Sequence, residues 1–171
     1  MPDALNGGMQ ASIAERIAYG QPLDPVVEDD VVHAAPRSTT ALIGRILLAS
    51  IFLLSGFAKF TDPTGAVGYM NQVGIPYAGT LVYIAGAAEI LGGAALLLGF
   101  LTRVGALGLI VYLVITTLYF HNFWALPEPQ AKMQMVQFMK NLCIMGGLAM
   151  VVAFGPGKFS IDWKLRRPKE A

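Results

Sequence analysis

Residues 79–100 read GTLVYIAGAAEILGGAALLLGF, an apolar run interrupted by one charge, Glu89. The run has about the 20 residues that a helix needs to cross the hydrocarbon core of a bilayer. A carboxylate at the centre of such a helix costs roughly 2.5–3.5 kcal/mol on insertion scales, so it is expected to face protein and to have a partner. Small residues lie three or four positions from Glu89 and allow a second helix to approach that face: Ala85, Gly86, Gly92 and Gly93.

Other apolar runs of similar length predict further membrane spans. Together with the first run, they place four spans at about 41–60, 79–100, 103–121 and 136–154. Lipid cannot satisfy unpaired backbone polar groups, so spans this apolar predict an all-α integral membrane four-helix bundle over 41–157. The short connection between the second and third spans predicts an antiparallel hairpin.

Composition excludes several classes of protein and site. Of the 171 residues, 13% are charged, against about 25% in a typical soluble domain. The net charge of +1 gives no reason to expect nucleic acid as a partner. A single cysteine excludes an intramolecular disulfide, a Cys-rich iron–sulfur site and c-type haem attachment. With two histidines far apart, His33 and His121, we expect no metal site and no covalently bound cofactor.

Residues 1–40 form a polar tail in which acidic residues outnumber basic ones. It lacks the basic start and apolar core of a signal peptide. Capping-box spacing from Ser12 to Glu15 predicts a short helix over about 13–19. The prolines in the rest of the tail predict a segment that is largely extended, or disordered until something binds it, and is a candidate docking arm for other subunits.

Lysine and arginine residues near the spans predict the orientation in the membrane. One side holds most of them, and the other holds Lys59 and Lys132. The richer side is expected to be cytoplasmic, so both termini are cytoplasmic and residues 158–171 form a basic tail. The cations on the richer side are Arg37, Arg103, Lys158, Lys164, Arg166, Arg167 and Lys169.

Polar side chains concentrate in the external half of the predicted bundle, in stripes at helical spacing. They are Ser55 and Lys59 on the first span, Tyr112, Thr116 and Tyr119 on the third with His121 at its end, and Gln134, Gln137, Lys140 and Asn141 on the fourth.

Lys140 and Arg45 are the expected ion-pair partners of Glu89. By the helical rise, Lys140 begins about 6 Å below the external surface and Glu89 about 15 Å, a difference that a lysine side chain largely spans. Arg45 is offset similarly from the inner side. Lys140 is favoured because Gln137 and Asn141 share its face.

Each of these residues also has a structural interpretation. The Glu89 pair can serve only to set helix register. Lys59 and Arg45 lie near span ends, where snorkelling to the headgroups needs no special function. His121 at a span end can be an ordinary interfacial residue.

Several short segments resemble the DoxX family in order and spacing over residues 41–162. They are GRI at 44–46, SGFAKF at 55–60, AEILGG at 88–93, LLGFLTR at 97–103, KNL at 140–142 and GPGKFSID at 155–162. The resemblance implies a multi-pass protein of the bacterial inner membrane with four helices. It also implies an association with membrane redox systems, which in this family include a thiosulfate:quinone oxidoreductase and a complex linked to thiol and radical defence.

The first functional hypothesis is a quinone-interacting subunit of a membrane oxidoreductase, with a quinone as its bound cofactor. Glu89 would exchange protons, and Lys140 would act beside it as the second catalytic residue. Lys140 and His121 would donate hydrogen bonds to carbonyl oxygens, and Lys59 with Lys140 would attract an external anion such as thiosulfate. The expected lining of the substrate or quinone site is Lys59, Tyr119, His121, Gln137 and Asn141.

The alternative hypothesis is a non-catalytic accessory or assembly subunit of a larger respiratory or photosynthetic complex. It would use the small-residue helix faces and residues 1–40 to bind its partners, or form a homo-oligomer. A small-solute transporter ranks lowest, because four spans without a detectable repeat are few for a carrier.

Overall fold

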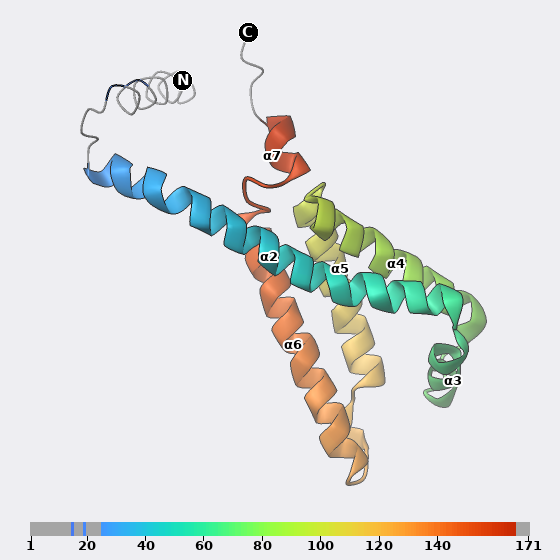
Figure 1. Cartoon of the computed structure of the whole chain (residues 1–171). Coiled ribbons are helices and arrows are strands. Elements are labelled where there is room, and N and C mark those ends of the chain that lie inside the picture. The colour runs from blue at the N-terminus through green and yellow to red at the C-terminus, as the bar shows by residue number, and fades with distance from the viewer. Residues whose placement is uncertain (1–14, 16–18, 20–24, 167–171) are drawn as a thin grey trace. The chain divides into compact units, whose positions relative to one another are not determined.

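The computed structural model describes Glu15, Tyr19 and residues 25–166 of the chain, and the regular elements in this part are helices. In chain order they are α2 (Pro25–Thr61), α3 (Thr64–Gln72), α4 (Ala78–Leu98), α5 (Thr102–Phe120), the short 3-10 helix η1 (Phe123–Ala125), α6 (Gln130–Phe154) and α7 (Ile161–Arg166) (Figure 1).

Four helical segments are long and apolar enough to cross a bilayer: Ser38–Thr61, Ala78–Leu98, Thr102–Ala125 and Gln130–Phe154. The prediction of an all-α membrane protein with four spans is therefore confirmed. The fourth helix begins at Gln130, earlier than the predicted span, which began at about residue 136. The sequence prediction started late because the first turns of this helix are polar and carry little hydrophobic signal.

The N-terminal segment differs from expectation, because α2 begins at Pro25 and residues 25–40 are helical rather than extended. Proline is well tolerated at the first position of a helix, where its fixed φ suits the helix and its missing N–H would be unpaired anyway. The helix predicted over 13–19 lies mostly outside the described residues. Of that segment, the amide of Tyr19 donates to the carbonyl of Glu15 at 3.1 Å, as in a helical turn.

Residue contacts divide the chain after Ser38 into two units, and the packed helices belong to the second unit, Thr39–Ala171. In this unit α5 packs against both α4 and α6. Four helices supply one apolar core, whose buried members are Ala49, Phe52, Leu96, Ala106, Leu109, Leu113 and Leu148.

The crossing of α2 and α4 depends on glycine. A Cβ atom built on Gly56 would lie 2.8 Å from the carbonyl oxygen of Gly86, and one on Gly86 would lie 3.1 Å from Cβ of Lys59. Such contacts leave no room for a larger residue. The expected tight face of the second span is therefore real, and two helices share it: Gly86 and Gly93 face α2, and Gly92 faces Leu109 of α5.

At one end of the bundle, the segment around α7 joins the α4–α5 turn. The Asp162 carboxylate accepts hydrogen bonds from the amides of Leu101 and Thr102, both at 2.9 Å, and from the Thr102 hydroxyl at 2.7 Å. The Asp162 amide donates to the Gly99 carbonyl at 2.8 Å. Asp162 thereby satisfies amides at the start of α5 that have no partner within the helix.

Candidate functional site

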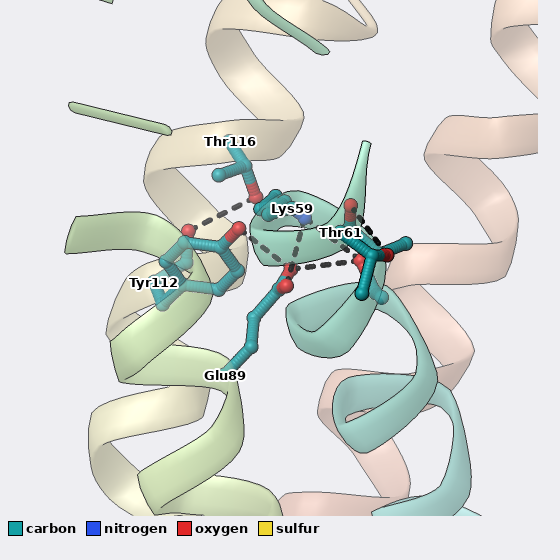
Figure 2. Close-up of polar contacts among 7 residues, drawn as sticks. Lys59, Thr61, Glu89, Tyr112 and Thr116 are labelled. Carbon is teal, nitrogen blue, oxygen red and sulfur yellow. Dashed lines mark hydrogen bonds and ion pairs between the residues drawn. The ribbon is translucent and has the colours of Figure 1, made fainter. Parts of the chain in front are cut away.

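Glu89 lies in the middle of α4, is 5% exposed, and accepts hydrogen bonds from two other helices. Lys59 Nζ donates to Oε2 at 2.7 Å, and Tyr112 Oη donates to Oε1 at 2.7 Å. Ser55 Oγ lies 3.2 Å from Oε1 and also accepts from Lys59 Nζ at 2.8 Å. Figure 2 shows the carboxylate between Lys59 and Tyr112. We call Ser55, Lys59, Glu89 and Tyr112 the Glu89 cluster.

The local sequence explains how the cluster forms. Ser55 and Lys59 are four residues apart on α2, so they share a helix face. Gly56 lies between them in the sequence and lets α4 approach that helix closely. Glu89 and Tyr112 lie almost equally far from the turn at Gly99–Leu101, so the antiparallel α4–α5 hairpin brings them to the same depth.

The predicted partners of Glu89 were wrong, since its ion pair is with Lys59 and not with Lys140 or Arg45. Side chains in a helix point back towards its N-terminus. Lys59 lies near the C-terminus of α2, so its side chain reaches back into the bundle, towards Glu89. Lys140 points the opposite way, towards the start of α6, and donates to Gln137 Oε1 at 2.5 Å.

Arg45 lies at the other end of α2's membrane segment and is 2% exposed. One of its terminal nitrogens donates to the Phe159 carbonyl at 2.5 Å. Its Nε and its other terminal nitrogen are enclosed and have no hydrogen-bond partner among the described residues. Arg45 therefore belongs with the segment that precedes α7, and the expected structural pair with Glu89 is not formed.

The other residues predicted for one site do not hydrogen-bond to the Glu89 cluster within the described part of the chain. Tyr119 is 60% exposed. Asn141 is buried and donates to the Thr117 hydroxyl at 2.9 Å, which joins α6 to α5. His121 contacts Gln134. Gln137 and Lys140 bond each other on an exposed part of α6.

Sequence reasoning did not assign Ser55 and Tyr112 to the site, although both lie in polar stripes. Two signals could have identified them as partners of Glu89. Ser55 shares a helix face with Lys59, and Tyr112 lies at the depth of Glu89 on the next helix of the hairpin.

An apolar groove of about 480 Å³ lies between α4 and α5, and Tyr112 is part of its lining. The lining follows α5 from Leu101 to Tyr112, about 16 Å by the helical rise. The lining includes small residues on both helices, so the groove reaches close to their backbones; these residues are Ala88, Gly92 and Gly108. Tyr112 thus belongs both to the groove lining and to the Glu89 cluster, at one end of an apolar surface.

Comparison with known proteins identifies relatives of this chain. Residues 40–122 match the sequence profile of the DoxX family. The chain is 36% identical to the inner membrane protein YqjF of Escherichia coli K12, over 74% of this chain and 92% of that protein. It is 33% identical to the inner membrane protein YphA of the same organism, over 75% and 91% of the two chains.

A more distant relative is a Surfeit locus protein 4 homolog of Drosophila melanogaster, 28% identical over 93% of this chain and 53% of that protein. No solved structure matches the chain. The profile match contains the whole Glu89 cluster and the groove, and it ends before α6.

Proposed function

This chain belongs to the DoxX family of membrane proteins, and from that premise we propose that it is a quinone-interacting membrane subunit of a redox system. The observation that carries the proposal is the double position of Tyr112, which bonds Glu89 at 2.7 Å and lines the α4–α5 groove. Quinone sites need an apolar slot with a few placed polar groups, and this groove with one hydroxyl at its end fits that description.

When bound, a quinone supplies reversible uptake of electrons and protons, with the electrons coming from a partner subunit or a substrate. The residues of this chain would bind it and handle protons. The groove would hold its apolar part, and Tyr112 would present the polar group nearest to its head.

Protonation of Glu89 would control the Tyr112 hydroxyl. Tyr112 has a single O–H, and it donates this hydrogen to the Glu89 carboxylate. A protonated carboxyl group can donate a hydrogen bond itself, which frees the Tyr112 hydrogen to point into the groove. Lys59 is the more exposed member of the ion pair, with 18% of its side chain accessible against 6% for Glu89. Lys59 would therefore connect the buried acid to water.

The groove is tested by filling it. A Cβ atom on Gly108, in the lining, would meet no atom within 4 Å, so a side chain can start there without a backbone clash, and Gly108→Leu adds bulk to the groove lining. Gly146→Leu on α6 is the matched control, because a Cβ there also meets nothing within 4 Å. After purification in mild detergent, extracted quinone should be lost from the Gly108 variant and kept by the Gly146 variant. Equal retention in both would contradict the groove as the site.

The role of Glu89 is tested separately with Glu89→Gln, which keeps the size of the side chain and removes its charge. A redox titration of bound quinone should show a pH-dependent midpoint potential in the native protein. That dependence should flatten in the variant while the amount of bound quinone is unchanged. A native pH dependence in Glu89→Gln would exclude Glu89 as the proton-exchanging group.

A second candidate function is that of a non-catalytic accessory subunit of a larger membrane complex. It is favoured by the division of the chain after Ser38, because the Glu89 cluster and the groove lie in the second unit alone. In this reading, the first unit would bind the partner. Deleting residues 1–36 should leave the bundle folded and abolish co-purification with the complex. Full co-purification of the truncated protein would exclude this docking role.

A further inference from the structure

A second set of polar groups links α3, α5 and α6 at the end of the bundle where α5 stops. Tyr69 Oη donates to the Phe120 carbonyl at 2.7 Å. Gln134 Nε2 donates to Tyr69 Oη at 3.0 Å, and Gln134 Oε1 lies 2.7 Å from His121 Nδ1. We call Tyr69, Phe120, His121 and Gln134 the His121 network. It shares no residue with the Glu89 cluster.

The direction of every hydrogen bond in this network follows from the bond between the Tyr69 hydroxyl and the Phe120 carbonyl. The Phe120 carbonyl can only accept, so the single hydroxyl hydrogen of Tyr69 must point to it. The Tyr69 oxygen must then accept, and the Gln134 atom facing it must be the amide NH₂. The Gln134 carbonyl oxygen therefore faces His121, whose Nδ1 must carry a hydrogen. The donors and acceptors along this chain of hydrogen bonds therefore fix both the orientation of the Gln134 amide and the tautomer of His121.

Because a neutral imidazole has one N–H, placing it on Nδ1 leaves a lone pair on Nε2. Nε2 of His121 has no hydrogen-bond partner within the described part of the chain. Among the described side chains, the polar atoms that are both enclosed and unpartnered belong to Arg45. Nε2 is consequently not enclosed, and the half-buried His121 offers this lone pair to its surroundings.

We propose that Nε2 of His121 is a preorganised hydrogen-bond acceptor for a ligand with a phenolic hydroxyl, the group that distinguishes a quinol from a quinone. An acceptor lone pair attracts a hydroxyl and repels a carbonyl oxygen. The network thereby reverses the role expected from sequence, in which His121 donates to a quinone carbonyl. Only the choice of ligand rests on the proposed function, since the tautomer follows from the geometry alone.

Nitrogen NMR with ¹⁵N-labelled histidine tests the tautomer directly. The chain has two histidines, His33 and His121, so His33→Asn assigns the spectrum. At a pH where the ring is neutral, His121 should show a protonated Nδ1 and an unprotonated Nε2. Tyr69→Phe removes the group that orients Gln134, and should convert this single tautomer into a mixture. Tyr119→Phe, at an exposed tyrosine, should leave it unchanged. A protonated Nε2 in the native protein, or an unchanged spectrum in Tyr69→Phe, would overturn the inference.

The ligand preference is tested with two probes, 2,6-dimethylphenol and its methyl ether, in which a methyl group replaces the hydroxyl hydrogen. The phenol should shift the Nε2 resonance of His121, and the ether should not. Replacement of the acceptor in His121→Phe should weaken phenol binding by about tenfold, the value of one hydrogen bond. An equal response to both probes, or none to either, would overturn the proposed ligand class. Loss of quinone from the groove on Gly108→Leu does not depend on His121, so the two proposals can fail separately.

Discussion

At the scale of single residues, the hydrogen-bond donors that reach Glu89 include one positive charge, that of Lys59. Removing one partner of a buried ion pair typically costs 3–5 kcal/mol, because the remaining charge is left uncompensated. Because Lys59 is partly exposed, the free-energy cost of removing it is expected to lie at the lower end of this range.

We therefore expect Lys59→Met to lower the free energy of unfolding by about 3 kcal/mol, and the double variant Lys59→Met/Glu89→Met to recover most of it. Denaturation of the detergent-solubilised protein measures both. Lys132→Met is the control, because its pair with Glu128 at 3.7 Å is largely exposed and should contribute less than about 1 kcal/mol. If Lys132→Met lowered the free energy of unfolding as much as Lys59→Met, burial would not be the reason that the Lys59–Glu89 pair stabilises the protein.

At the scale of helices, the position of Lys59 relative to Glu89 depends on the glycine contact between α2 and α4. A Cβ on Gly56 would lie 2.8 Å from both the Gly86 carbonyl oxygen and Cγ1 of Ile90. A methyl group in so tight a contact forces the two helices apart, at a cost of about 1–3 kcal/mol.

Gly56→Ala is thus expected to lower the melting temperature and to separate the ion pair. Gly108→Ala is the matched control in a membrane helix, since its Cβ would meet no atom within 4 Å. The control should be as stable as the native protein or slightly more so, because alanine favours a helix by about 1 kcal/mol over glycine. An equal fall in melting temperature in both variants would show that the stability of the protein does not depend on the contact between α2 and α4.

The α4–α5 turn was placed correctly by the sequence, but its means of stabilisation were not foreseen. Gly99 adopts a left-handed conformation with φ of +67°, which glycine accepts without strain. The Asp162 carboxylate arrives from α7, about 60 residues later, to cap α5. The GPGKFSID segment that contributed to the family resemblance therefore includes the residue that ties the chain's C-terminal part to this turn.

At the scale of the molecule, the charges predict a membrane orientation that can be measured. Five cations of the described part of the unit Thr39–Ala171 lie in or beside segments of the Arg45 end: Arg45, Arg103, Lys158, Lys164 and Arg166. At the opposite end, Lys59 is committed to its ion pair, and Lys132 and Lys140 are exposed cations. By the positive-inside rule, we expect the Arg45 end and both termini to be cytoplasmic, in an inner membrane like that of the Escherichia coli relatives.

Reporter fusions test this orientation. Green fluorescent protein fused after the last residue should fluoresce, and alkaline phosphatase inserted in the connection between η1 and α6 should be active. The opposite pattern would reverse the orientation. Such a reversal would also place the His121 network on the cytoplasmic side and change the source of any ligand that reaches it.

From the sequence alone, the membrane class, the four spans, the α4–α5 hairpin and the need for a partner to Glu89 could be derived. These depend on length, hydropathy and spacing, which are properties of single segments. The identity of the partner could not, because it depends on the direction in which side chains leave their helices and on how closely two helices cross. Only the tertiary structure decided that Lys59 reaches back across the Gly56–Gly86 contact to Glu89, while Lys140 points away along α6 and Arg45 turns to Phe159.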